Sequence, residues 1–140
     1  MQSNVIKLRA AIETLRTDTV EKPGDLDLGD LNIRAGGACR LAVPLQRCRS
    51  CTCLNLADNE VMDHGAVALA RSLHKNIALT SLTLRATRMS DVGAEALAQM
   101  LRANSTLCSI NLRDNEITDR GAGALMAALK VIDDIRHEVF

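Results

Sequence analysis

Apolar and polar residues follow two patterns in turn along this chain, and the pair of patterns recurs every 28 residues. The first pattern is a short alternation, such as S-L-T-L-R at residues 81–85, which predicts a half-buried strand. The second, Gly-Ala-x-Ala-Leu-Ala-x-x-Leu, begins at Gly65 and again at Gly93, and it predicts a helix with a leucine and alanine face. Four copies of this strand-and-helix unit occupy residues 23–50, 51–78, 79–106 and 107–134.

Five positions of the unit hold the same residue in all four copies, and so define five columns. The columns are Leu28/Leu56/Leu84/Leu112, Gly37/Gly65/Gly93/Gly121, Ala38/Ala66/Ala94/Ala122, Leu41/Leu69/Leu97/Leu125 and Leu45/Leu73/Leu101/Leu129. A fixed period with shared apolar positions indicates a repeat architecture. Parallel strands joined by crossover helices stack into a curved solenoid. We therefore predict one α/β domain over residues 1–140, with a concave parallel sheet and convex helices.

The segment before the repeats, residues 1–22, predicts an amphipathic helix over residues 4–18. Its apolar positions recur at helical spacing, and they are Val5, Leu8, Ile12 and Leu15. A helix this short is marginal by itself, so its apolar stripe must pack on something. We interpret it as a cap over the first repeat, because a solenoid needs its open end covered. The alternative is a helix that binds a partner.

Side chains at the predicted helix ends also repeat. Asp63, Asp91 and Asp119 stand two residues before the shared glycine, where a carboxylate suits the start of its own helix by accepting backbone N–H bonds. Asn76 and Asn104 are expected to end their helices in the left-handed conformation that asparagine tolerates.

The first and last repeats depart from the pattern. Pro44 falls within the first predicted helix and should shorten or kink it. The last repeat lacks a stop signal, so its helix can continue through residues 130–135 towards Phe140. Residues 135–140 then form a C-terminal extension, which is either a carboxyl cap or the edge of a longer solenoid.

The repeat resembles that of leucine-rich-repeat proteins, in the long-repeat class of ribonuclease inhibitors. The motif L-x-x-L-x-L-x-x-N-x-I matches at residues 107–117, and the resemblance extends over residues 23–132. It implies an α/β leucine-rich-repeat solenoid and a buried asparagine ladder at Asn59 and Asn115. Leucine and threonine replace the asparagine in the other two repeats, so the ladder should be interrupted there. The resemblance also implies a role in protein binding on the concave face.

Composition and charge narrow the possible partners. Seventeen basic and seventeen acidic residues cancel, and no basic run occurs, so we expect neither nucleic acid nor an anionic membrane as a partner. No apolar run reaches the ~18 residues of a membrane span. Five cysteines, an odd number without framework spacing, suggest reduced thiols and a cytoplasmic location. The chain is expected to be a monomer or a subunit of a hetero-complex.

Candidate chemistry is sparse. Cys48, Cys51 and Cys53 form the single metal-like cluster, but a closed zinc site needs four ligands and Cys51 fills an apolar column. We expect a buried Cys51 beside exposed thiols, and no metal. The three histidines have no spacing to a nucleophile, and no glycine-rich phosphate loop follows a strand. The sequence therefore predicts a protein that is not an enzyme and carries no cofactor.

Outward positions of the strands, together with the residues that follow them, form the candidate partner-binding surface. Its residues are Asp25, Asp27, Asn55, Asp58, Ser81, Thr83, Arg85, Ser109, Asn111, Arg113 and Asp114. Because neighbouring strands lie ~4.8 Å apart, Arg85 and Arg113 are predicted to stand side by side and to receive a carboxylate or phosphate. The alternative is a set of solvated charges, some of them paired, such as Arg113 with Asp114.

We expect a cytoplasmic scaffold or adaptor that binds a protein partner on its concave strands. One alternative is a regulator of a nucleotide hydrolase, as in Ran GTPase-activating proteins of this repeat type, with Arg85 or Arg113 as an arginine finger. Uniform repeats without a protruding loop disfavour it. Another alternative is a structural subunit of an assembly that also buries the convex helices.

Overall fold

The computed structural model describes residues 2–20 and 24–139, with side chains described as far as Leu129. The junction at residues 21–23 and the terminal Phe140 lie outside the described residues. Helices and strands alternate in the order α1 (Gln2–Thr17), β1 (Asp25–Asp27), α2 (Ala35–Leu45), β2 (Cys53–Asn55), α3 (Met62–Leu73), β3 (Ser81–Thr83), α4 (Asp91–Ala103), β4 (Ser109–Asn111) and α5 (Asp119–Val139).

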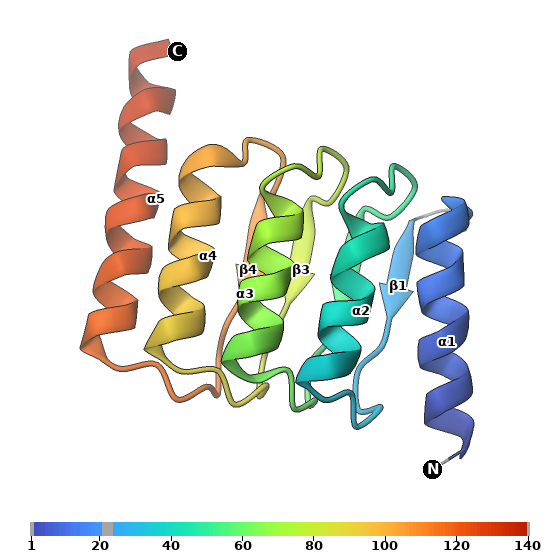
Figure 1. The fold of residues 1–140 in the computed structure, drawn as a ribbon. Helices are drawn as coiled ribbons and strands as arrows, with labels where there is room; N and C mark the ends of the chain where they lie inside the picture. The colour runs from blue at the N-terminus through green and yellow to red at the C-terminus, as the bar shows by residue number, and fades with distance from the viewer. Residues whose placement is uncertain (1, 21–23, 140) are drawn as a thin grey trace.

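The four strands form one parallel sheet in the order β1-β2-β3-β4. Each pairing joins residues 28 apart, such as Leu26 with Leu54 and Leu54 with Leu82. Helices α2 to α5 lie side by side in a second layer, and α1 flanks the amino-terminal end (Figure 1). The predicted α/β solenoid of four repeats is confirmed, although the strands have three residues each and not five.

The core fills the space between sheet and helices. The leucine columns predicted to face inward are fully buried in the two central repeats, at Leu56, Leu69, Leu84 and Leu97. In the last repeat Leu112 and Leu125 are half-buried, because none of the described residues stacks beyond them. The glycine column has a steric cause: a Cβ added at Gly65 would lie 2.9 Å from the Cβ of Ala38 on the preceding helix.

A buried asparagine joins the first two repeats. Asn59, 3% exposed, accepts hydrogen bonds at Oδ1 from the backbone N–H groups of Leu31 (3.2 Å) and Ile33 (2.8 Å). Its Nδ2 donates to the carbonyl oxygens of Leu28 (2.8 Å) and Leu56 (2.9 Å). One amide therefore satisfies backbone groups that would otherwise be buried without partners.

Asn115 joins the last two repeats in the same manner. Its Oδ1 accepts from the N–H groups of Thr87 and Met89, each at 3.0 Å, and its Nδ2 donates to the Leu84 oxygen at 2.7 Å. The Thr87 hydroxyl donates within its own repeat to Leu84 at 2.9 Å. The asparagine ladder is thus interrupted between the second and third repeats, as the sequence indicates.

The aspartates at the helix starts differ from prediction. The Asp63 carboxylate caps the following helix, α4, and not its own helix. Its Oδ1 accepts from the backbone N–H groups of Ser90 (2.9 Å) and Gly93 (3.0 Å), and its Oδ2 accepts from the Ser90 hydroxyl (2.7 Å). Burial acts to raise the Asp63 pKa, but these hydrogen bonds together outweigh it and hold the pKa below its ordinary value.

Asp91 repeats this arrangement for α5. It accepts from the Thr118 hydroxyl (2.5 Å), the Thr118 N–H (2.8 Å) and the Gly121 N–H (3.0 Å). These bonds, that of the Thr118 hydroxyl first, lower the Asp91 pKa. Asp119 occupies the same column, and its carboxylate accepts no hydrogen bond from the described residues. Each capping carboxylate therefore serves the next repeat along the chain.

The helix ends are also fixed by side chains. Asn76 donates to the Leu45 oxygen (2.6 Å) of the preceding repeat and accepts from the Leu79 N–H (2.8 Å). Asn104 makes the equivalent bonds and has φ −86°. The predicted left-handed conformation is wrong at both residues, because hydrogen bonds to neighbouring backbone end the helices.

The helices of the first and last repeats have the backbone that the sequence predicts. Helix α2 ends at Leu45, directly after Pro44, and is shorter than α3 and α4. Helix α5 continues to Val139 without a break. Whether its last turns act as a cap stays a prediction.

Helix α1 packs beside α2 through Ala11 and Leu15, which are buried, with Leu8 and Ile12 half-buried. Val5 was predicted to belong to this apolar stripe but is 67% exposed, because it lies beyond the edge of the contact. The role of α1 as a cap stays a prediction.

A carboxylate also fastens the end of α1 to the repeats. Asp18 Oδ1 accepts from the Cys48 thiol (3.1 Å) and from the N–H groups of Arg49 and Ser50, both at 2.7 Å. The hydrogen bond from Cys48, followed by those of Ser50 and Arg49, holds the Asp18 pKa far below its ordinary value. Asp18 adopts a left-handed φ of 55°, which ends the helix at this point.

Candidate partner-binding surface

The sheet brings the predicted surface residues together in rows. Strand register places Asp25, Cys53, Ser81 and Ser109 in one row, and Asp27, Asn55, Thr83 and Asn111 in the next. Each residue of the predicted surface is exposed or half-buried, while Leu54 and Leu82 between the rows are buried. We call the eleven residues of the predicted partner-binding surface, from Asp25 to Asp114, the strand face.

Several polar side chains of the strand face hold the ends of the strands. Asn55 donates from Nδ2 to Asp27 Oδ1 across the strand pair at 2.8 Å and accepts from the Ala57 N–H at 2.9 Å. Asn111 likewise accepts from the Arg113 N–H at 3.1 Å. These contacts hold the side chains of Asp27, Asn55 and Asn111 in place before any partner binds.

Arg85 does not stand free beside Arg113. Its Nε donates to Asp114 Oδ2 at 2.8 Å, and its NH1 group donates to Asp58 Oδ2 at 3.0 Å, so one guanidinium spans three repeats. Left-handed backbone at Asp58 (φ 56°) and Asp114 (φ 58°) turns the chain where these carboxylates lie. The suggested pair of Arg113 with Asp114 is therefore not formed, since Arg85 takes that carboxylate. Arg113 is exposed and forms no ion pair with the described residues.

A second ion-pair group lies in the loops that follow the strands. Glu60 contacts Arg88 at 3.1 Å and Arg34 at 3.8 Å, and so links the first three repeats. Sequence reasoning missed this group. The signal was present, since Glu60 and Arg88 share one column and Arg34 follows that column by two positions in the first repeat.

The cysteines give no metal centre. Among the described residues no group of three or more histidine, cysteine, aspartate or glutamate side chains is placed to hold a metal ion. Cys51 is fully buried, and burial raises its pKa to about 12, so the thiol stays neutral. Cys48 was expected to be exposed but is buried against Asp18. The Cys53 pKa is raised by its hydrogen bond with Asp25.

The two histidines whose side chains are described are not brought together into one site. His64 lies in the first turn of α3 and His74 lies at the other end of that helix, while the side chain of His137 lies outside the described ones. In the described part of the chain, no helix combines the length and apolar character that a membrane crossing needs.

Parallel strands on one face, helices on the other and asparagines bonded between repeats define the class of leucine-rich-repeat solenoids. A leucine-rich-repeat family model matches residues 47–70, 75–98 and 103–126, about half of the chain. The chain belongs to the leucine-rich-repeat family.

Solved structures with this fold include two that are described as actin-binding site 2 of leiomodin-1 and the C-terminal domain of a tropomodulin. One is leiomodin-1 actin-binding site 2, with 16% sequence identity and a TM-score of 0.71; the match covers 92% of this chain and 91% of that one. The other is the tropomodulin C-terminal domain of Caenorhabditis elegans, with 11% identity and a TM-score of 0.57, covering 94% of this chain and 96% of that one. At these identities the likeness shows the fold alone. No curated protein matches the chain.

Proposed function

We propose that this chain is a protein-interaction module that binds a protein partner through the strand face, as a scaffold or adaptor. The observation that carries the proposal is the ordered row of polar and charged side chains across four strands. Surfaces that are ordered before binding lose less conformational entropy when they meet a partner. The polar character of the strand face suits a partner with charged groups at matching positions.

Charge is divided along the strand face. Asp25 and Asp27 lie on the first strand, and Arg113 follows the last strand. Between them, Arg85 is neutralised by two carboxylates of the same face. A complementary partner would therefore offer a cation near β1 and a carboxylate near Arg113.

Actin is the first partner to test, because leiomodin-1 actin-binding site 2 shares the fold of this chain. The regulator of a nucleotide hydrolase is less well supported. An arginine finger must reach a partner's phosphate, and the guanidinium of Arg85 is held at Nε by Asp114 and at NH1 by Asp58. The other alternative, a structural subunit of a larger assembly, would require neighbouring subunits to bury the helices as well as the strand face.

Charge reversal tests the proposal. The double variant Arg113→Glu/Asp25→Lys keeps the net charge, reverses the charge at Arg113 and replaces one of the two first-strand carboxylates by a cation. The matched control, Arg9→Glu/Glu13→Lys, makes the same exchange at exposed positions of α1. Neither variant touches the core, so each site should change the free energy of unfolding by under about 0.5 kcal/mol.

Binding is measured by co-sedimentation with filamentous actin and by crosslinked affinity purification from the source cells. We expect the strand-face variant to lose about tenfold or more in affinity for its partner while the α1 control keeps wild-type affinity. Equal affinity of wild type and the strand-face variant would remove the strand face as the binding surface. If actin fails to bind the wild type, and another protein binds the wild type and the α1 control but not the strand-face variant, then that protein is the partner and the strand face is still the binding surface.

A further inference from the structure

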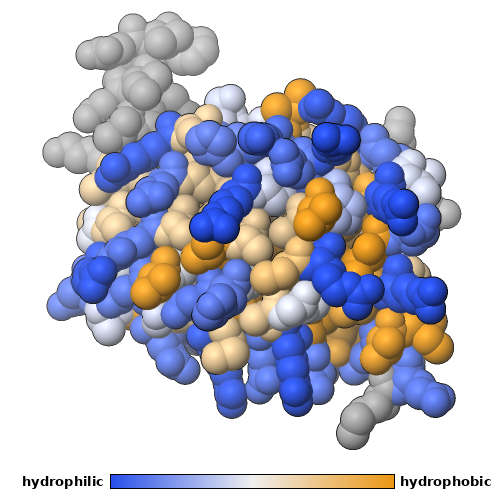
Figure 2. Space-filling model, viewed as in Figure 1, coloured by the Kyte–Doolittle hydropathy of each residue, from blue (hydrophilic) through white to orange (hydrophobic). Residues whose placement is uncertain are grey.

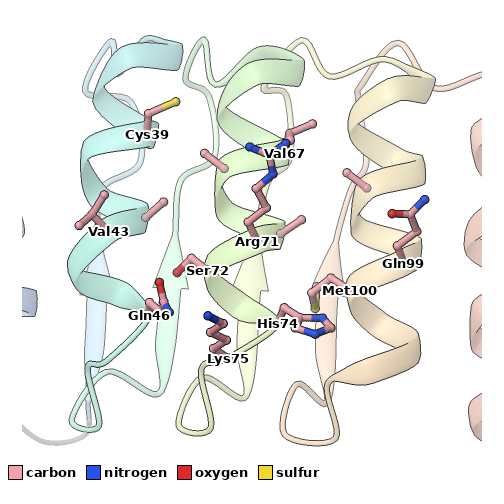
Figure 3. Close-up of a pocket in the computed structure, with 14 residues that line it drawn as sticks. Cys39, Val43, Gln46, Val67, Arg71, Ser72, His74, Lys75, Gln99 and Met100 are labelled. Carbon is pink, nitrogen blue, oxygen red and sulfur yellow. The ribbon is translucent and has the colours of Figure 1, made fainter.

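A groove lies on the side of the molecule opposite the strand face, over helices α2, α3 and α4 (Figure 3). It has a volume of about 730 Å³ and takes residues from all three helices. Much of its lining is alanine, including Ala42, Ala68 and Ala96, and methyl side chains leave the space between neighbouring helices unfilled. The residues that decide its chemistry are Val43, Gln46, Ala68, Arg71, Ser72 and Lys75, and we call it the helix-side groove.

The surface of the groove is apolar at its centre and hydrophilic at its border. Figure 2 shows a patch of mildly hydrophobic residues over the helices, with hydrophilic residues around it. Val43 is an exposed apolar side chain of the lining, with 75% of its surface accessible. An apolar centre with a polar border is the usual anatomy of a protein-binding surface.

The charged residues of the lining carry one sign. Arg71 and Lys75 line the groove, and no aspartate or glutamate does. Both cations are exposed and form no ion pair with the described residues. Acidic residues are absent from the sequence between Asp63 and Asp91, so no neighbour on α3 neutralises this pair. The groove therefore attracts negative charge.

A buried hydroxyl lies at the floor. Ser72 is 4% exposed, and its Oγ has no hydrogen-bond partner among the described residues. In Figure 3 its oxygen is directed into the space between α2 and α3, on the side where Gln46 lies. A buried polar group without a partner is destabilising, and such groups in native structures call for an explanation. Ser72 lines the groove although its Oγ is buried, so rotation of this side chain towards the groove would bring the hydroxyl to a polar group of a seated ligand.

We propose that the helix-side groove binds an acidic amphipathic helix of a protein partner. A helix fits a channel between helices, and its apolar face would cover Val43 and the alanines. Arg71 lies in the last turn of α3 and Lys75 lies two residues beyond the end of that helix, so the two cations are neighbours at this end of α3, and glutamates spaced by one turn on the partner would meet them. A polar side chain on the same ligand face would meet Ser72 and Gln46.

The same features disfavour a nucleic acid ligand. Two cations are few for a phosphate backbone, and the chain offers no tryptophan or tyrosine for stacking on bases. The proposal is independent of the strand face, since the two surfaces lie on opposite sides. Occupation of both at once would make the molecule a bridge between two proteins.

The probe for the test is a helical peptide of about 18 residues, long enough to hold helix structure, built from alanine, leucine and glutamate with one glutamate per turn. The control peptide has lysine at each glutamate position. Each is titrated into the full chain labelled with nitrogen-15, and amide shifts are followed by nuclear magnetic resonance. We expect saturable shifts in α2 to α4 with the glutamate peptide, none on the strands, and no saturable shifts with the lysine peptide.

Three variants locate the site. Arg71→Glu/Lys75→Glu should weaken binding of the glutamate peptide by about tenfold or more, whereas Arg9→Glu/Arg16→Glu, an equal charge change on α1, should leave it unaltered. Ala68→Leu fills the groove without changing charge and should also weaken binding. If Ala68→Leu fails to fold, Ser72→Ala replaces it, and a severalfold loss of affinity is expected.

Other outcomes would overturn the proposal. Equal binding of the two peptides would mean unselective apolar contact. Shifts confined to the strands would place the acidic ligand on the strand face. Tighter binding of a single-stranded oligonucleotide of equal charge than of the glutamate peptide would assign the groove to a phosphate ligand.

Discussion

The cap that Asp63 supplies to the next helix can be measured by removing it. Asp63→Ala deletes three hydrogen bonds, two from the N–H groups of Ser90 and Gly93 and one from the Ser90 hydroxyl. Loss of a helix N-cap costs ~0.5 to 2 kcal/mol. Because the Asp63 carboxylate is partly open to solvent, screening limits the value, and we expect a loss of about 1 to 2 kcal/mol in the free energy of unfolding.

Asp119→Ala is the matched control. Asp119 stands in the same column and in the first turn of its own helix, but its carboxylate accepts no hydrogen bond from the described residues. Both variants therefore lose the interaction with their own helix dipole, ~0.3 to 1 kcal/mol, and only Asp63→Ala loses a cap. The difference between them, about 1 kcal/mol, isolates the contact between repeats.

Acid should reduce that difference. The Asp63 pKa is lower in the folded chain than the value of about 3.9 expected when unfolded, so the folded state holds this proton less tightly. Its contribution is complete above about pH 4 and is lost as the pH falls through the folded pKa. Urea denaturation at about pH 7 and about pH 3 measures both variants against wild type. Equal losses for Asp63→Ala and Asp119→Ala at neutral pH, or a gap between them that does not shrink in acid, would refute the cap.

Three further substitutions test the contacts that stabilise the repeats. Leu84→Ala should cost ~2 to 5 kcal/mol in urea denaturation because Leu84 is fully buried; a loss under about 1 kcal/mol would contradict the assigned core. Asn59→Ala should lower the free energy of unfolding by roughly 3 kcal/mol or more, since it leaves several buried backbone groups unpaired. A near-neutral result would contradict the proposed role of Asn59 in joining the first two repeats. Asp18→Asn should lower the thermal midpoint at neutral pH and make that midpoint less sensitive to acid. The folded pKa of Asp18 lies below its unfolded value, so the carboxylate adds its full stability above the unfolded pKa and loses it as the pH falls through the folded pKa; parallel pH profiles for variant and wild type would contradict the role of Asp18 in holding the end of α1.

The fold was predictable because the same pattern occurs four times in the chain. Leu56 and Leu84 occupy one column, and a column that stays apolar through every copy must face the core. The period also indicated the strand register directly, since residues 28 apart pair across the sheet. Asn59 and Asn115 were placed through the family resemblance, and their bonds have the implied form.

Contacts between columns were harder to predict. Asp63 looks like the cap of its own helix when α3 is considered alone, and the better geometry, 27 residues onward at Ser90, exists only after the helices stack. Arg85 was expected to stand beside Arg113, its neighbour in the column, and to receive a partner's carboxylate or phosphate. Instead it pairs with Asp58 and Asp114, the carboxylates on either side of it. The helix-side groove had no sequence signal, because alanine is common on both buried and exposed helix faces.

The caps that run from Asp63 to α4 and from Asp91 to α5 give the molecule a direction. In both, the acceptor precedes the donor along the chain. A ribosome releases the chain from the amino end, and domains can begin to fold as they emerge. Helices α4 and α5 of a nascent chain would thus each meet an acceptor that has already been synthesised. A chain made in the opposite order would expose the amide groups at the starts of these two helices until their caps were made.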